Sequence, residues 1–390
     1  MARLVTSARF AEATLGAAKR FNRRTVLKAG AAAGAVTVAG PFFLRQALAA
    51  GEVNILMWSD YLPESFVKGF EEKTGLKINF TGIGSNEEIL NKLRATRGEG
   101  FDICSPTASR APQWAELEVL QPIDMERVPI DKVNPAMTTI GEKNWNFGGK
   151  GSHWLPHIWG TEGVAWRTDL WSPKGEFPSY GDVWSEENAG KTMGRPYSMM
   201  PTAGLYMETT GELDPGSIWK AYESQDAMRP IWEKVVAWCI ERKSRIKLFW
   251  NDADTQKNGL LNEGVVCGQT WDGPPLALKT AGEPVMYRAP KEGSMAWIDG
   301  MAIPRGAKNI EQAYAFIDFA YQAEPAGTAI KTHGYNSPVV GAEKFAGETY
   351  AKNFGDAYPG DALVNLNPWP PVQPWYAAVQ TEYVNKFQAA

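Results

Sequence analysis

The chain has 390 residues, of which 44% are hydrophobic and 22% charged, a balance typical of a globular protein with one large or two ordinary domains. Its formal net charge is −4, and residues 50–390 alone carry −11, because the first 49 residues hold eight Lys or Arg and one Glu. An acidic chain argues against a nucleic-acid partner and is compatible with a cationic ligand.

Residues 1–49 have the pattern of a twin-arginine export signal. Arg23 and Arg24 precede a Gly- and Ala-rich apolar run that ends in "PFFLRQALAA", with a small-residue cleavage pattern. The run is too short for a membrane-spanning helix, and no Cys near the cut would carry a lipid. We expect cleavage after Ala49 and a periplasmic protein. The alternative is a surface arginine pair before a short helix.

The next section of the chain alternates between strand and helix patterns. Strands are expected at 52–58, 76–82 and 101–106, and helices at 63–75, 85–98 and 109–124. Pro63 is typical of a helix start and Gly75 of a helix end, while Ser85 and Glu88 have the spacing of a capping box. This order predicts a parallel sheet flanked by helices, with ligands bound at the carboxyl ends of the strands.

The rest of the chain keeps the α/β character. Helical material is expected at 217–243 and 307–322, a strand and turn at 264–273, and two longer strand patterns at 153–160 and 294–303. The pattern predicts two α/β lobes that are joined by crossing strands, with a cleft between them. We place the first lobe at 50–158, the second at 159–294, and a return to the first lobe with a C-terminal segment at 295–390.

No assembled set of catalytic or metal-binding residues is recognisable in the sequence. His153 and His157 are four residues apart, but Pro156 lies between them and the segment is predicted to be extended, which argues against a metal site. We therefore expect no catalytic residues, no metal and no cofactor. A secreted glycosidase that uses carboxylates alone is the alternative from a different class.

The chain contains three cysteines, so at most one disulfide can form within it. Cys104 lies in "FDICSP", which has the pattern of a buried strand end. We therefore predict that Cys239 pairs with Cys267, in a compartment that permits disulfides.

Tryptophan is abundant, with 16 in the chain, and several of them stand beside a carboxylate near a predicted strand end. The pairs are Trp58 with Asp60, Trp271 with Asp272, and Trp297 with Asp299. A Trp face attracts cations and a carboxylate binds an ammonium group, so these pairs predict an amine site. Burial of the tryptophans in the core is the alternative. Polar and aromatic residues also close the first three predicted strands: Trp58, Ser59, Asp60, Tyr61, Ser85 and Thr107.

Several segments, in order, resemble the bacterial spermidine/putrescine-binding proteins. They are "ILMWSDYLPESFVKGFEEKTGLKINFTGIGSNEEILNKL", "FDICSPT", "LQPID", "PHIWGTEGVAW", "APKEGSMAWIDGMAIPRGAKNIEQA" and "HGYNSP". The resemblance implies a monomeric periplasmic receptor with a class II two-lobed binding-protein fold. It also implies closure of the lobes on a small amine and delivery of that amine to an ABC permease in the inner membrane.

The resemblance also implies a set of ligand-binding residues. The aromatic walls and carboxylates of the family fall on Trp58, Ser59, Asp60, Tyr61, Trp271, Trp297, Asp299 and Tyr335, the last of these after Gly334. To these we add Ser85, Thr107 and Asp272 as expected binding residues. Cys267 stands where some putrescine-binding relatives have a disulfide cysteine.

The sequence departs from this family at two places. After the third strand, "SPTASR" offers Thr107 and then Ser109, without the aromatic residue that often follows in the family. Between Gly194 and Met207 there is no Asp or Glu, and Arg195 is added. Either Asp272 or Glu162 then anchors a second ammonium, or the solute has one cationic group and an acidic or neutral far end near Arg195. A receptor of the same fold for an amino acid, a betaine, a sugar or an oligopeptide is the further alternative.

Overall fold

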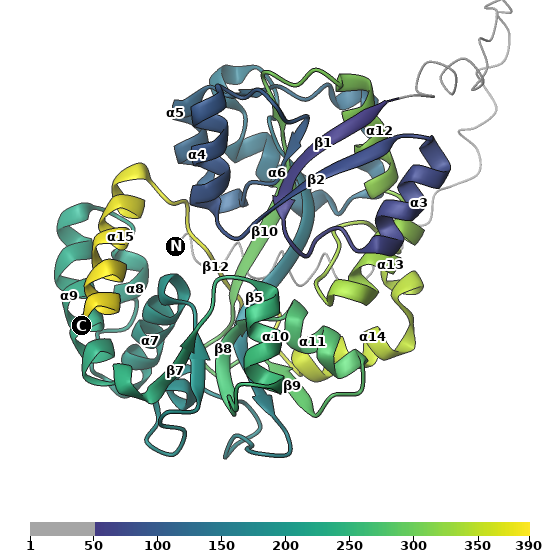
Figure 1. Cartoon of the computed structure of the whole chain (residues 1–390). Coiled ribbons are helices and arrows are strands. Elements are labelled where there is room, and N and C mark those ends of the chain that lie inside the picture. Colours follow the sequence, from purple (N-terminus) through teal and green to yellow (C-terminus); the bar gives the residue numbers. More distant parts are fainter. Residues whose placement is uncertain (1–50) are drawn as a thin grey trace, which may run out of the picture.

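The computed structural model describes residues 51–390 and contains two main sheets flanked by helices, and a separate two-stranded pair (Figure 1). The predicted export signal at 1–49 lies outside the described residues. Within residues 51–390, no helix combines the length and apolar character needed to cross a bilayer.

The first sheet is parallel, as the alternating pattern predicts, with strand order β2-β1-β3. Its strands are β1 (Glu52–Trp58), β2 (Lys77–Ile83) and β3 (Ile103–Cys104). Helices α3 (Glu64–Thr74) and α4 (Asn86–Thr96) connect them. Pro63 and Gly75 flank α3 as predicted, and Ser85 Oγ accepts the Glu88 N–H at 3.2 Å at the start of α4.

The second sheet is built on two long antiparallel strands, β5 (Leu155–Arg167) and β10 (Met295–Met301). Its strand order is β12-β10-β5-β8-β6-β7, and β9 also pairs with β5. The other strands are β6 (Thr192–Gly194), β7 (Ile246–Phe249), β8 (Cys267–Trp271), β9 (Val285–Arg288) and β12 (Asn367–Pro368). The strands β4 (Leu120–Gln121) and β11 (Ile303–Pro304) form a separate pair.

The β5 and β10 strands run from the second sheet into the part of the molecule that holds the first (Figure 1). Beyond β10 the chain pairs with the first sheet, through a bridge between Cys104 and Ala302. The predicted lobe boundaries, after residues 158 and 294, fall inside β5 and directly before β10. As domain boundaries they stay a prediction.

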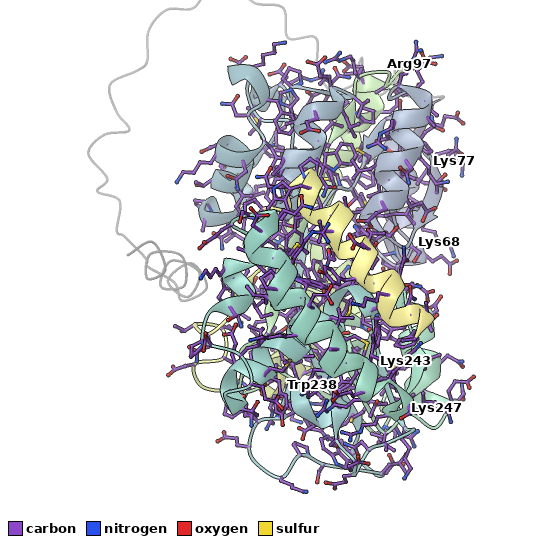
Figure 2. The ribbon with its side chains drawn as sticks, turned by 90° about the vertical axis from the view of Figure 1, so that its left-hand side faces the viewer. Lys68, Lys77, Arg97, Trp238, Lys243 and Lys247 are labelled. Carbon is purple, nitrogen blue, oxygen red and sulfur yellow. The ribbon has the colours of Figure 1, made fainter. Side chains whose placement is uncertain are left out.

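Helices cover both sheets. On the first part they are α5 (Ala111–Leu117), α6 (Pro135–Asn144) and α12 (Ile310–Ala320), with α13 (Ala323–His333) and α14 (Glu343–Ala357) beside them. The second part carries α7 (Pro196–Thr210), α8 (Ser217–Lys220), α9 (Gln225–Glu241), α10 (Ala253–Leu261) and α11 (Gly273–Thr280). The C-terminal α15 (Pro374–Ala389) packs on α7 and α9. Figure 2 shows α15 beside α9, where Lys243 donates to the Gln388 carbonyl at 2.7 Å.

Two predicted helices are shorter than expected. The helix expected at 109–124 ends at Leu117, because Glu118 has a left-handed conformation (φ 49°) and Leu120 then enters β4. The material expected at 217–243 is broken into α8 and α9, and Ser224 caps the second helix by accepting the Ala227 N–H at 3.1 Å.

The predicted disulfide between Cys239 and Cys267 is wrong, because all three cysteines are buried free thiols. Cys239 packs among the side chains of α7, α9 and α15, whereas Cys267 begins β8 in a separate small cluster with Trp166. The two thiols therefore face different parts of the core. Cys104 is buried in β3, as its pattern predicts.

We expect the thiols to be unreactive in the native protein, because they are buried and burial raises the pKa of each well above its usual value. A thiol reagent should label the protein only slowly, and three thiols should appear after unfolding without reductant. A single reactive thiol in the unfolded, unreduced protein would mean that a disulfide had formed.

Gly334 ends α13 with φ 83°, and a Cβ there would lie 2.2 Å from the Gly273 carbonyl oxygen. Gly75 has a similar φ of 76° at the end of α3, with no atom within 4 Å of its Cβ position. Gly75→Ala should therefore lower the free energy of unfolding only by the strain of the left-handed conformation, about 1 kcal/mol. Gly334→Ala should lower the free energy of unfolding by roughly 1–3 kcal/mol more, because the backbone at Gly273 must move to make room for the new Cβ. Denaturant unfolding compares the two variants, and equal losses would contradict the close approach.

Candidate functional site

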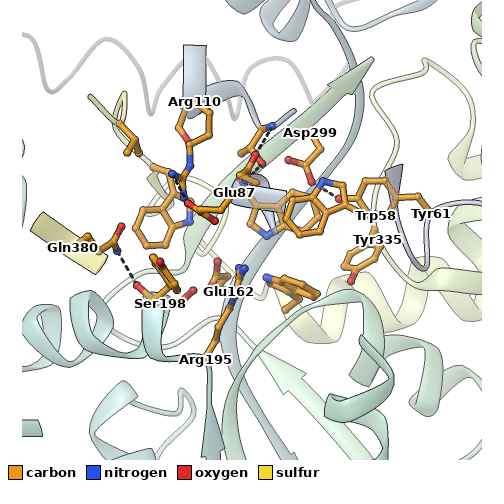
Figure 3. A pocket seen from close by; sticks show the side chains of 18 of the residues that line it. Trp58, Tyr61, Glu87, Arg110, Glu162, Arg195, Ser198, Asp299, Tyr335 and Gln380 are labelled. Atoms are coloured by element: carbon orange, nitrogen blue, oxygen red, sulfur yellow. Dashed lines mark hydrogen bonds and ion pairs between the residues drawn. The ribbon is translucent and has the colours of Figure 1, made fainter. Parts of the chain in front are cut away.

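One pocket gathers side chains from both parts of the molecule (Figure 3), and it encloses about 730 Å³, part of it open to solvent. The first part contributes the end of β1, the start of α4 and the loop after β3. The second part contributes the segment before α7, the end of β8 and α15. The crossing strands β5 and β10 supply Glu162, Trp297 and Asp299 between them.

Five aromatic rings surround one end of this pocket. Tyr61 stacks on Trp297 with ring centroids 6.5 Å apart, and Tyr335 meets the Tyr61 and Trp297 rings edge-on at 5.6 and 5.4 Å. Trp58, at the end of β1, meets Trp271, at the end of β8, edge-on at 5.9 Å. We refer to these five residues as the aromatic box.

Asp299 projects into the aromatic box from β10, on the same side of the strand as Trp297, because side chains two residues apart share a face. Its Oδ2 accepts a hydrogen bond from Tyr61 Oη at 2.5 Å. Its Oδ1 is buried and has no hydrogen-bond partner among residues 51–390. Burial raises the pKa of Asp299 to about 7, against hydrogen bonds with the Thr107 and Tyr61 side chains that lower it. Neutral hydroxyl groups, and no protein cation within 4.0 Å among the described residues, therefore hold this carboxyl group in place.

Asp60 is the second acidic group at this end. Burial raises its pKa to about 6, against a hydrogen bond with Tyr335 that lowers it. Within the described part of the chain, no Lys, Arg or His side chain lies within ion-pair distance, 4.0 Å, of either Asp60 or Asp299. The aromatic box thus holds two carboxyl groups without a protein cation to pair with them.

Arg195 lies at the other end of the pocket, directly before α7. Its guanidinium carbon stands 5.3 Å from the ring centroid of Trp271, and its backbone N–H donates to Gln269 Oε1 at 3.0 Å. Gln269 Nε2 in turn donates to Glu162 Oε2 at 2.6 Å. Burial lowers the pKa of Arg195 and raises that of Glu162. Gln269 therefore bridges the backbone of Arg195 and the carboxylate of Glu162.

A second acid and base at this end are paired with each other. Arg110 Nη1 lies 2.9 Å from Glu87 Oε1, and the Arg110 side chain is only 12% exposed. Burial opposes ionisation of Glu87, but Arg110 and Arg195 together lower its pKa below the usual value. Glu87 follows Asn86, whose side chain exchanges two hydrogen bonds with Thr107 and so ties α4 to the loop after β3.

The structure brings eight of the eleven expected binding residues together around this pocket: Trp58, Asp60, Tyr61, Thr107, Trp271, Trp297, Asp299 and Tyr335. Ser59 is exposed outside the lining, and Ser85 only caps α4. Asp272 is buried behind the pocket, where its Oδ2 accepts from Tyr358 Oη at 2.7 Å and Asn336 Nδ2 at 3.0 Å. It therefore does not replace the missing acid, and of the two expected substitutes only Glu162 lines the pocket.

Sequence reasoning missed several lining residues, among them Asn86, Glu87, Arg110, Tyr197, Ser198, Tyr222, Trp369 and Gln380. Asn86 and Glu87 follow the helix-capping Ser85, so their place at a strand-to-helix turn was an available signal. Gln380 had no such signal, because only packing of α15 on the second part brings it to the pocket. Across the described residues, no three His, Cys, Asp or Glu side chains gather as a metal site.

Comparison with known proteins gives matches over most of the chain. A family model described as bacterial extracellular solute-binding protein matches residues 65–354. The spermidine/putrescine-binding periplasmic protein of Salmonella typhimurium is 26% identical over 338 residues, which cover 85% of this chain and 90% of the relative.

Two solved structures share the fold. The spermidine/putrescine ABC transporter substrate-binding protein PotD of Streptococcus pneumoniae has a TM-score of 0.65 at 22% identity, covering 87% of this chain and 99% of that one. The periplasmic binding protein MotA of A. tumefaciens B6, solved with glucopine, has a TM-score of 0.67 at 14% identity, and the match covers 86% of this chain and 99% of that one. The fold is thus the two-lobed periplasmic-binding-protein fold, and the chain belongs to the bacterial extracellular solute-binding protein family.

Proposed function

We propose that the protein is the periplasmic receptor of an ABC importer and that it binds a small organic amine between its lobes. The observation that carries the proposal is the aromatic box, in which the buried Asp299 and the partly buried Asp60 lie without a protein cation within 4.0 Å among the described residues. A buried carboxylate is costly unless a cation and hydrogen bonds compensate it. A ligand ammonium would supply both.

The aromatic rings fit the same ligand. The faces of Trp297, Tyr61 and Tyr335 attract a cation, and their apolar surface suits the methylene groups next to an amine. Asp299 Oδ1, which has no partner in the described chain, is the acceptor for one ammonium N–H. Such a charge-assisted hydrogen bond is roughly twice as strong as a neutral one.

Transport requires the ligand to favour a closed form. Side chains from both parts line the pocket, so a ligand that touches both stabilises the arrangement in which they are close. We propose that this closed form, as a monomer, delivers the solute to a membrane permease after export by the twin-arginine route. We expect binding without turnover.

The names of similar proteins agree with an amine. The Salmonella typhimurium relative is named for spermidine and putrescine, and the A. tumefaciens protein was solved with glucopine. One fold therefore serves several solutes, and the side chains of the pocket decide which of them binds.

Asp299→Asn should weaken binding of the amine by roughly 1.5 to 3 kcal/mol, because it removes the charge from a hydrogen bond to the ammonium. Asp131→Asn, at an exposed position, is the control and should bind as the wild type does. Isothermal titration with putrescine, cadaverine, spermidine and single amines measures the difference. Unchanged affinity in a folded Asp299→Asn protein would exclude Asp299 from the site.

Asp299 should by itself lower the stability of the empty protein as the pH rises from about 4 to 8. The pKa of Asp299 is about 7 in the folded protein and about 3.9 unfolded, so the folded state binds the extra proton over this range. The stability that the protonated Asp299 side chain contributes is fully present below pH 4 and is lost as the pH rises through 7. Asp299→Asn should therefore stabilise the empty protein by roughly 2 to 4 kcal/mol at pH 8 and by little at pH 4. Denaturant unfolding at both pH values checks this, and a pH-independent difference would contradict it.

A further inference from the structure

The pocket holds two sets of opposite charges that are not paired with each other. Within residues 51–390, no cation lies within 4.0 Å of Asp60 or Asp299 in the aromatic box. At the other end Arg195 lies near Glu162 and Glu87, whose charges act on it, but no carboxylate oxygen is within 4.0 Å of its guanidinium nitrogens. We propose that the solute is a zwitterion, an amine whose far end carries a carboxylate, and that Arg195 binds this carboxylate. The inference rests on the proposed function, because it takes the ammonium end as given.

The surroundings of Arg195 fit an anion. Its Nε is buried and has no hydrogen-bond partner in the described chain, and only its Nη2 reaches a protein acceptor, the Gly84 carbonyl, at 3.4 Å. The guanidinium packs over Trp271 at 5.3 Å and Trp250 at 6.0 Å, which fixes its orientation. Arg195 is also the N-cap residue of the 15-residue helix α7, without a side-chain cap hydrogen bond, and the helix dipole favours negative charge at this end. A planar guanidinium with a free edge is suited to a carboxylate.

A second ammonium does not fit this end equally well. The two acids present are already engaged, Glu162 with Gln269 at 2.6 Å and Glu87 with Arg110 at 2.9 Å. The chain has no Asp or Glu between Gly194 and Met207. Arg195 would repel a diamine's far end, and such a like charge discriminates against the wrong ligand.

The two ends are close enough for a small molecule. Trp271 touches both, since its ring lies 5.9 Å from that of Trp58 in the aromatic box and 5.3 Å from the Arg195 guanidinium. Figure 3 shows Arg195 and Glu162 beside the group formed by Trp58, Tyr61 and Tyr335. An amino acid with a few methylene groups between its charges would span from Asp299 to Arg195 along these indoles.

The test compares ligands that differ only at the far end. Cadaverine, 5-aminopentanoate, 5-aminopentanol and pentylamine share a five-carbon amine and end in an ammonium, a carboxylate, a hydroxyl and a methyl group. The corresponding sets of four-carbon and six-carbon ligands test other distances between the two ends of the solute. In isothermal titration, the best amino carboxylate should bind at least about tenfold tighter than the diamine of the same carbon number. A diamine that binds tighter than every amino carboxylate would overturn the inference.

Variants of Arg195 test the assigned residue. Arg195→Gln should weaken the affinity for the amino carboxylate by at least about tenfold and leave the affinity for pentylamine unchanged within about twofold. It should increase the affinity for cadaverine. Arg195→Lys keeps the charge beside Glu162 if the Gln variant fails to fold, and it should lose affinity for the carboxylate ligand because the planar fork is gone. Arg94→Gln, at an exposed position of α4, is the control.

The outcomes separate this inference from the proposed function. If no amine of any kind binds and a sugar or another neutral solute does, the proposed amine receptor is wrong. If amines bind but cadaverine is preferred, or if Arg195→Gln weakens all amines equally, only the zwitterion inference fails.

Discussion

The antiparallel pairing of β5 with β10 is the constraint on which the pocket depends. It joins the two parts of the molecule and fixes the register that sets Trp297 opposite Gly160 and Asp299 opposite Ile158. Gly160 is required there, because a Cβ would lie 2.5 Å from both the Trp297 ring and Asp272 Oδ1. A shift of one residue would turn Trp297 and Asp299 away from the pocket. The strands that connect the lobes therefore also carry the central binding groups.

Charge is kept in the pocket at a cost in stability. Asp299, Asp60 and Glu162 have pKa values raised by burial, and Arg195 has a pKa lowered by it. Tyr61 positions Asp299, Tyr335 positions Asp60, and Gln269 positions Glu162 and accepts from the Arg195 backbone N–H. Among residues 51–390, none of these four charged groups has a charge of the opposite sign at 4 Å or less. Such an arrangement leaves the charges of Asp60, Asp299 and Arg195 available to a ligand, and closure on that ligand would recover part of the cost.

Asp272 and Asp299 illustrate how one sequence pattern takes two roles. Both follow a tryptophan near the end of a strand, and burial raises the pKa of both to about 7. Asp299 faces the pocket, whereas Asp272 receives hydrogen bonds from Tyr358 and Asn336 and holds β8 against the segment after α13. The spacing from Trp differs by one residue, two positions for Asp299 and one for Asp272. Asp299 lies inside β10 and shares a face with Trp297, whereas Asp272 lies directly after β8 with helical φ −74° and ψ −37°, so strand alternation does not extend to it.

The sequence by itself determined the α/β class, the parallel direction of the first three strands, the crossing strands and most of the aromatic box. These features follow from periodicity, helix caps and residue types, which are local properties. Only the tertiary structure decided that Cys239 and Cys267 face different clusters, that Asp272 lies behind the pocket, and that Arg110 and Gln380 line it. These outcomes depend on packing between segments far apart in the chain, such as α15 against α7 and α9, and no local pattern specifies that packing.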